Sequence, residues 1–200
     1  MSARAPVLLV HGIWDRGAKL ERLRDAISRS VGGLVRTIDL VPNDGRAPIR
    51  ALAEQVRAAA EALRAEVGAE QIDLVGFSMG ALVCRTYVQL LGGKRMVRRF
   101  VSISGPHAGT WVAHALPFEG TRDMRPGSAL LAELEADPDP WGACEVHVLY
   151  TPFDLMIVPA RSSELNGART TTRVLLPLHR SMILHPRATE RVAALLADAT

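Results

Sequence analysis

The stretch "LVGFSMGALVCR", Leu74 to Arg85, places two glycines and a serine between an apolar run and a helical segment. Glycine in a core strand gives up backbone entropy and side-chain packing, so two glycines this close must meet a geometric demand. A strand that runs straight into a helix needs a sharp turn with very small neighbours, and Gly76 and Gly80 supply that room. The apex residue, Ser78, then projects at a helix N-terminus, where the dipole and free N–H groups favour a developing negative charge. The pattern predicts a nucleophilic serine; the alternative is an incidental serine in a structural turn.

The composition is that of one soluble globular domain. The 200 residues are 48% apolar and 22% charged, which is ordinary for such a chain and sufficient for a sizeable core. The 24 basic and 21 acidic residues are interleaved along the predicted helices, a pattern typical of solvated helix faces. Charge therefore favours neither a nucleic-acid-binding nor a membrane-surface protein, and we expect no nucleic-acid partner.

Cysteine usage and apolar run lengths exclude further classes of protein. Cys84 and Cys144 form no CxxC motif and belong to no Cys/His cluster with zinc spacing, so we expect buried free thiols and no metal. The four-residue apolar run before His11 is too short for a signal-peptide core, and no run approaches the length of a membrane span. The sequence as given predicts a cytoplasmic protein without stable membrane insertion.

Apolar runs alternate with amphipathic segments along the chain. Strands are predicted over residues 7–10, 34–40, 71–77, 98–104, 145–150 and 172–176, and long helices over 18–31, 49–67, 80–91 and 186–197. This alternation predicts a single α/β domain over 1–200 whose central sheet is mostly parallel, with helices on both faces.

A long segment, about 107–141, breaks this alternation. It contains four prolines, several glycines and only one short helical stretch, near "SALLAELEA". A long irregular insert in a compact domain is usually functional or mobile, and its position after the fourth strand predicts a lid-like element over the active edge of the sheet. Its apolar residues either form an acyl site or anchor the loop to the core: Trp111, Val112, Leu116, Phe118, Leu130 and Leu131.

A serine hydroxyl needs a base, and the base needs an acid that orients it. On a sheet of this kind the expected chain order is serine, acid, histidine, with each residue just after a strand. His179 directly follows the last strand and is favoured over His185, which precedes the last helix; Asp154 follows the penultimate strand and is favoured over Glu164. The other histidines fit less well because they precede the serine, lie in the insert or alternate within a strand: His11, His107, His114 and His147.

An oxyanion hole needs two N–H donors. The residue after the nucleophile, Met79, supplies one backbone N–H. The loop after the first strand, "HGIWDRG", supplies the other, and we assign it to Ile13 because Gly12 lets the backbone approach closely.

Five stretches resemble the small bacterial lipases of the α/β-hydrolase superfamily: "VLLVHGIWD", "IDLVGFSMGALVCR", "VSISGPHAGT", "DLMIVPARSSELNGA" and "LHRSMILHP". Together they span most of the chain, and in the last stretch His179 is the residue that aligns with the catalytic histidine of those lipases. The resemblance implies a minimal α/β-hydrolase fold and hydrolysis of carboxylic esters by Ser78, Asp154 and His179, without a metal or organic cofactor. Phe77 and Ala81 depart from the residues common in the lipases, and the insert matches them poorly.

Two rival functions use the same sequence features. An intracellular acyl-thioesterase would use the same residues as an esterase, so the sequence does not separate the two. A catalytically inactive scaffold that binds lipid or a partner would keep the fold without the chemistry. Because 200 residues leave little room for a cap domain, an open cleft for short or medium acyl chains is expected.

Overall fold

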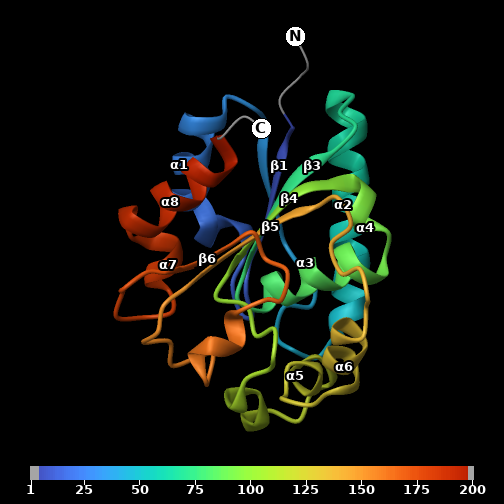
Figure 1. Cartoon of the computed structure of the whole chain (residues 1–200), viewed down its shortest axis with the longest axis vertical. Helices are drawn as coiled ribbons and strands as arrows, with labels where there is room; N and C mark the ends of the chain where they lie inside the picture. Colours follow the sequence, from blue (N-terminus) through green and yellow to red (C-terminus); the bar gives the residue numbers. More distant parts are fainter. Residues whose placement is uncertain (1–4, 198–200) are drawn as a thin grey trace.

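The computed structural model describes residues 5–197, and their six strands form one sheet in which every neighbouring pair is parallel. In spatial order the strands are β2 (Val35–Ile38), β1 (Val7–Val10), β3 (Ile72–Phe77), β4 (Val97–Ile103), β5 (Glu145–Tyr150) and β6 (Thr170–Arg173). The predicted α/β class with a parallel sheet is therefore confirmed. Because all strands run the same way, the loops that follow them meet at one edge, in the lower half of Figure 1.

Helices cover both faces of the sheet, as expected (Figure 1). One face carries α1 (Glu21–Val31), α7 (Ser181–Leu184) and α8 (Pro186–Ala197), and the other carries α2 (Ile49–Val67), α3 (Met79–Leu90), α4 (Gly93–Met96) and α6 (Ala129–Glu135). Strand β1 shows why two layers are needed. Leu8 and Val10 join the apolar cluster with α2 and α3, whereas Val7 and Leu9 join the cluster with α1 and α8. Both clusters exclude water, and each helix layer buries one face of the sheet.

The last strand differs from its prediction. It was expected over 172–176, where the apolar run lies, and it forms over Thr170–Arg173 instead. Within the described residues 5–197 it pairs only with β5, and the pairing begins with His147 opposite Thr170. Its side chains alternate between half-buried and exposed, so its signal is a run of β-branched threonines and not a continuous apolar run.

The 107–141 insert is more ordered than its prolines suggest. It contains the short 3₁₀ helix η2 (Trp111–Ala115), α5 (Glu119–Asp123) and the expected helix α6, and further 3₁₀ turns occur outside it at η1 (Gly17–Leu20) and η3 (Ala160–Ser163). The backbone N–H of Ile49 donates to the Asp123 carboxylate at 2.9 Å, so the insert satisfies an open donor at the start of α2. The insert therefore lies at the loop edge of the sheet, next to the N-terminus of α2.

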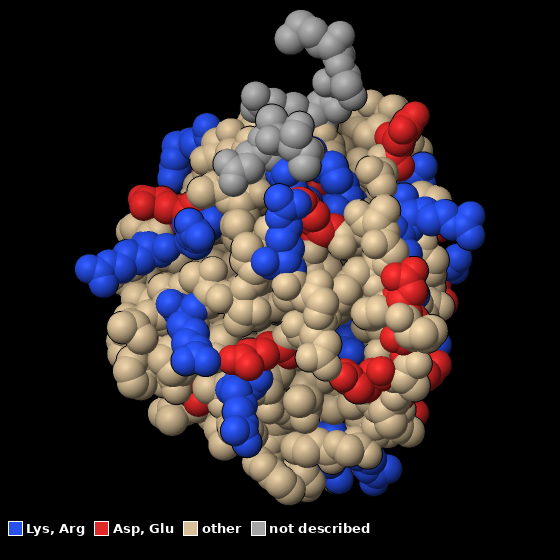
Figure 2. Space-filling model, viewed as in Figure 1, with Lys and Arg blue, Asp and Glu red and all other residues tan. Residues whose placement is uncertain are grey.

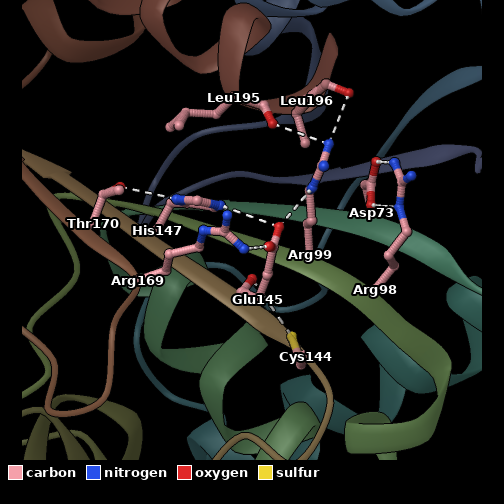
Figure 3. Close-up of polar contacts among 10 residues, drawn as sticks. All are labelled: Asp73, Arg98, Arg99, Cys144, Glu145, His147, Arg169, Thr170, Leu195 and Leu196. Atoms are coloured by element: carbon pink, nitrogen blue, oxygen red, sulfur yellow. Dashed lines mark hydrogen bonds and ion pairs between the residues drawn. The ribbon is translucent and has the colours of Figure 1, made fainter. Parts of the chain in front are cut away.

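A polar cluster joins β4, β5 and α8 at the opposite edge of the sheet (Figure 3). The buried Arg99 donates to the Leu195 and Leu196 carbonyls at 3.2 and 3.3 Å and to the Glu145 carboxylate at 3.0 Å. The neighbouring Arg98 forms an ion pair with the buried Asp73 carboxylate at 2.6 Å. The last carbonyls of a helix have no intrahelical partner, so Arg99 both satisfies them and ties α8 to the sheet.

Among residues 5–197, no helix has the length and apolar character needed to cross a membrane.

Candidate active site

Ser78 occupies the turn between β3 and α3 with φ 57° and ψ −127°. A Cβ on Gly76 would lie 2.5 Å from the Ala81 Cα, and one on Gly80 would lie 2.6 Å from the Val10 carbonyl oxygen. Real Cβ atoms do not approach other atoms so closely, so only glycine fits at either position. The Ser78 N–H donates to the Ile103 carbonyl at 2.9 Å, which ties the turn to the end of β4. The two glycines therefore have the role that the sequence predicted for them.

Asp154 and His179 lie in direct contact although 25 residues separate them. His179 Nδ1 and Asp154 Oδ2 are 2.6 Å apart, and both side chains are buried. The other carboxylate oxygen, Oδ1, accepts the backbone N–H groups of Met156 and Ile157 at 2.9 and 3.0 Å. This places the acid in the loop after β5 and the imidazole in the loop after β6, as expected.

The pKa of Asp154 reflects these contacts. Burial by itself disfavours the charged carboxylate, but the hydrogen bond and charge of His179 and the N–H donors of Ile157 and Met156 outweigh that effect. The net result is a pKa below the usual 3.8, so Asp154 stays ionised. An ionised carboxylate on Nδ1 holds the His179 ring in one orientation and leaves Nε2 as the nitrogen that can exchange a proton.

Ser78 and His179 line one cleft of about 380 Å³ at the loop edge of the sheet. The Phe77 ring lies 4.7 Å from the His179 ring, centroid to centroid, and packs against one side of it. The cleft is further lined by residues of the loop after β1 and by single residues of the other loops: Gly12, Ile13, Trp14, Asp15, Lys19, Met156 and Arg180. The fold thus brings the predicted serine and histidine to one cavity.

His11 shapes the first loop. Its Nε2 accepts the Leu40 N–H at 2.9 Å, so its Nδ1 carries the proton and donates to the Gly12 carbonyl at 2.8 Å. These bonds hold the loop against the turn so closely that a Cβ on Gly12 would lie 2.9 Å from the Ser78 Cβ. Sequence reasoning noted the glycine but missed the positioning role of His11.

Ile13 and Met79 are the two predicted oxyanion donors. Within residues 5–197 their backbone N–H groups donate to no protein acceptor. Both residues border a second, apolar pocket of about 80 Å³ that also contains Ser78. The two N–H groups are therefore available next to the serine.

The apolar residues of the insert divide between the two roles considered for them. Val112 and Leu116 line the 80 Å³ pocket beside Ser78, whereas Leu130 and Leu131 are buried in the core against α3. The insert therefore both forms a wall of the pocket and anchors itself, and Trp111 remains exposed to solvent.

The runner-up acid and base lie elsewhere. His185 is exposed at the start of α8, where its Nδ1 accepts the Arg187 N–H at 3.2 Å. Glu164 accepts a hydrogen bond from the Tyr150 hydroxyl at 2.5 Å. Neither lines the cleft that holds Ser78.

Two further histidines are buried packing residues. His107 Nε2 contacts the Ser102 hydroxyl at 2.6 Å, and burial, with the charge of Arg85, lowers its pKa well below 6.5. His147 Nδ1 contacts the Thr170 hydroxyl at 2.9 Å, which agrees with the packing role expected for a histidine alternating within a strand.

Sequence reasoning missed Thr110. Its hydroxyl donates to the Met156 carbonyl at 2.8 Å and accepts the Val158 N–H at 3.0 Å. It thus joins the insert to the loop that carries Asp154. The stretch "PHAGT" contained this threonine, but no spacing in the sequence indicates which loop it contacts.

A separate cavity of about 970 Å³ is lined by neither Ser78 nor His179. Its charged groups pair with one another, Arg85 with Glu135 at 3.4 Å and Arg173 with Glu164 at 3.5 Å. No cluster of three or more potential metal-ligating side chains occurs in the part of the chain that the structure describes.

The chain is similar to characterised thioesterases and lipases. It is 35% identical over 109 residues to the lysosomal thioesterase PPT2 of Mus musculus, a match that covers 53% of this chain and 35% of that protein. It is 31% identical over 121 residues to the triacylglycerol lipase of Pseudomonas fragi, covering 58% of this chain and 39% of the lipase. The matched regions thus amount to little more than a third of these relatives' length.

Solved structures share the fold at low sequence identity. The mature lipase BlEst2 of Bacillus licheniformis superposes with a TM-score of 0.80 at 15% identity, covering 97% of this chain and 92% of the lipase. Lipase B of Aspergillus fumigatus gives a TM-score of 0.81 at 16% identity, covering 98% of this chain and 53% of the lipase. The fold is therefore that of the α/β-hydrolases. The family model for palmitoyl protein thioesterase matches residues 6–135, and the chain belongs to that family.

Proposed function

We propose that this protein is a serine hydrolase that cleaves carboxylic esters through an acyl-enzyme intermediate. One observation carries the proposal. Ser78, at the apex of the β3–α3 turn, lines the same 380 Å³ cleft as His179, whose Nδ1 is 2.6 Å from the Asp154 carboxylate. Nucleophile, base and orienting acid in this arrangement support acyl transfer.

In the first half-reaction the Ser78 oxygen attacks the acyl carbon while His179 Nε2 takes the hydroxyl proton. The tetrahedral intermediate collapses, the bond to the leaving oxygen breaks, and the imidazolium returns its proton to the alcohol. In the second half-reaction His179 removes a proton from water as the water attacks the acyl carbon. The acid is released and Ser78 regains its proton.

The negative oxygen of each tetrahedral intermediate needs donors that are already in place. We assign this role to the backbone N–H groups of Ile13 and Met79, which have no protein acceptor within residues 5–197. Losing one such donor typically raises a barrier by about 2.7–4 kcal/mol. The N-terminus of α3 adds its dipole at the same point.

The pocket beside Ser78 supports a preference for short or medium acyl chains. Its volume of about 80 Å³ is small, and its walls are mostly apolar, including Val112, Leu116 and Met124. Pockets for drug-sized ligands span about 300–1,000 Å³. We expect turnover to rise with the first few methylenes of the acyl chain and then to stop rising.

The family match favours a second candidate, thioester hydrolysis, because the model that matches residues 6–135 describes thioesterases. The same three side chains would act, and the leaving group would be a thiol. A thiolate is a better leaving group than an alkoxide because its conjugate acid is stronger. The two functions therefore differ in the leaving-group side of the cleft and not in the catalytic residues.

The test is a set of acyl chains of increasing length, each supplied both as a nitrophenyl ester and as a thioester. We expect Ser78→Ala and His179→Ala each to lower kcat by about 10³-fold or more. His185→Ala is the control and should retain wild-type kcat/KM. A fluorophosphonate should label the wild type and spare Ser78→Ala.

Each result decides between the alternatives. Turnover that survives in Ser78→Ala would rule out the acyl-enzyme. Absence of both labelling and turnover would favour the inactive scaffold. For equal acyl groups, the larger kcat/KM identifies the ester or the thioester as the preferred substrate.

A further inference from the structure

Large apolar side chains are exposed at one edge of the molecule. Eleven such side chains are exposed among residues 5–197, and seven of them lie on the four loops that follow β1, β4, β5 and β6. We call these seven the apolar rim: Trp14, Trp111, Phe153, Leu155, Met156, Leu175 and Leu178. Scattered exposed apolar residues are normal, but a set gathered on neighbouring loops marks an interaction surface.

Part of the apolar rim lies at the opening of the candidate active site. Trp14 and Met156 line both the cleft and the apolar pocket, and Leu178 directly precedes His179. The loops lie in the lower half of Figure 1, and the lowest part of the surface in Figure 2 is mostly uncharged. Whatever the rim binds is therefore brought against the mouth of the site.

Hydrogen bonds join the four loops to one another. The Trp111 N–H donates to the Val158 carbonyl at 3.0 Å, which joins the loops after β4 and β5. The Thr151 hydroxyl donates to the Leu176 carbonyl at 2.5 Å, which joins the loops after β5 and β6. These bonds hold the loops that carry the rim together in the folded chain.

An ion pair joins the loop after β1 to the other loops. Arg180, beside the base, contacts the Asp15 carboxylate at 3.1 Å and so joins the loop after β6 to the loop after β1. Loops held in this way lose little conformational entropy on binding.

Trp14 is held in a backbone conformation that costs free energy. Its φ is 58°, in the left-handed region that residues other than glycine rarely adopt, and 59% of its surface is exposed. An exposed indole gains nothing from burial in the core, and its strain costs about 1–3 kcal/mol. Strained, exposed residues of this kind gather at binding sites, and tryptophan is the side chain that best suits the boundary between water and lipid.

The charges on these loops determine which surface fits. On the loops after β1, β5 and β6 the three carboxylates are already paired: Asp15 with Arg180, Asp154 with His179 and Glu164 with Arg173. By contrast, Arg16, Lys19 and Arg161 are exposed or border the cleft and have no acidic partner within ion-pair distance among residues 5–197. These three loops therefore present apolar side chains together with uncompensated positive charge.

We propose that the apolar rim docks the protein peripherally on an anionic lipid surface, with the cleft facing that surface. Apolar and aromatic side chains enter the boundary of the acyl chains, and the basic side chains remain at the lipid phosphates. This adsorption needs no membrane-spanning helix. The proposed lipid binding is independent of the proposed catalysis, because binding can be measured in protein that lacks the Ser78 hydroxyl.

The test measures co-sedimentation of Ser78→Ala protein with vesicles of phosphatidylcholine, alone or mixed with phosphatidylglycerol. We expect stronger binding to the anionic vesicles. Adding Trp111→Ser and Leu155→Ser should lower the partition coefficient by about tenfold or more, because 61% and 72% of these residues are exposed and neither lines the cleft or the apolar pocket. Arg16→Gln with Arg161→Gln should remove the preference for anionic lipid and leave the apolar contribution in place.

The matched control is Leu34→Ser with Val67→Ser, two exposed apolar residues that precede β2 and β3 at the opposite edge of the sheet. It should bind like its parent. Equal losses in the rim and control variants, or no binding to either vesicle, would overturn the proposal. A dimer seen by analytical ultracentrifugation and abolished by the rim variant would also overturn it, since the surface would then serve a second copy of the chain.

Discussion

Three residues other than glycine have positive φ among residues 5–197: Trp14 (58°), Ser78 (57°) and Ser104 (48°). Each costs about 1–3 kcal/mol and persists only because its surroundings enforce it. Around Ser78 the enforcing contacts are backbone to backbone, at Gly76 and Gly80. Strain at this residue therefore follows from the sharp β3–α3 turn that exposes its hydroxyl.

Gly12 offers a direct test at the scale of one residue. Its missing Cβ would lie 2.9 Å from the Ser78 Cβ and 3.3 Å from the Ser78 Oγ, so Gly12→Ala must displace the serine or the Ile13 N–H beside it. A misplacement of about 1 Å can reduce rates by about 10²-fold, and we expect kcat/KM to fall by about that factor. The measurement is steady-state hydrolysis with Tm from the same preparation. We expect a Tm close to that of the wild type together with lost activity. Unchanged activity would show that the chain accommodates the added Cβ without moving Ser78 or the Ile13 N–H.

At the scale of elements, Arg99 connects a central strand to the last helix (Figure 3). It is buried, donates to the last carbonyls of α8 and contacts Glu145. Removing one partner of a buried charged network leaves the others without partners, which typically costs about 3–5 kcal/mol.

Arg99→Ala should therefore lower the free energy of unfolding by about 3 kcal/mol, measured by urea denaturation. The matched control is Arg24→Ala on α1, whose ion pairs with Glu21 and Asp25 are exposed to solvent. Such surface pairs contribute little, so the control should stay within about 0.5 kcal/mol of the wild type. Similar losses in both variants would contradict the role of Arg99 as the link between β4 and α8.

At the scale of the whole molecule, buried histidines make stability depend on pH. Burial lowers the pKa of His107 well below 6.5, assisted by the charge of Arg85, and burial also lowers the pKa of His147. Below about pH 6.5 the unfolded chain binds protons that the folded chain does not. The free energy of unfolding therefore falls as the pH drops through this range, by up to about 1.4 kcal/mol per pH unit for each such group. Asp154 acts at lower pH: its lowered pKa gives stability above 3.8 that disappears as the pH falls through the folded value.

Urea denaturation at about pH 7.5 and about pH 5.5 measures this dependence. His107→Gln should lose less stability than the wild type between the two pH values, because glutamine takes up no proton. His185→Gln, at an exposed position, is the control and should keep the wild-type difference. A difference that is the same in all three proteins would exclude His107 as its source.

The sequence alone determined the class of fold and the types and chain order of the candidate catalytic residues. Apolar runs specify buried parallel strands because both faces of the sheet exclude water, and "GFSMG" specifies a sharp turn because only glycine fits beside it. These effects are local, because they depend on residues that are close together in the sequence. The tertiary structure alone decided the 2.6 Å contact of His179 with Asp154, the tie between Thr110 and Met156, and the gathering of the apolar rim on four loops. Such contacts join residues that are distant in the chain, and only the parallel packing of the strands brings their carboxyl ends to one edge.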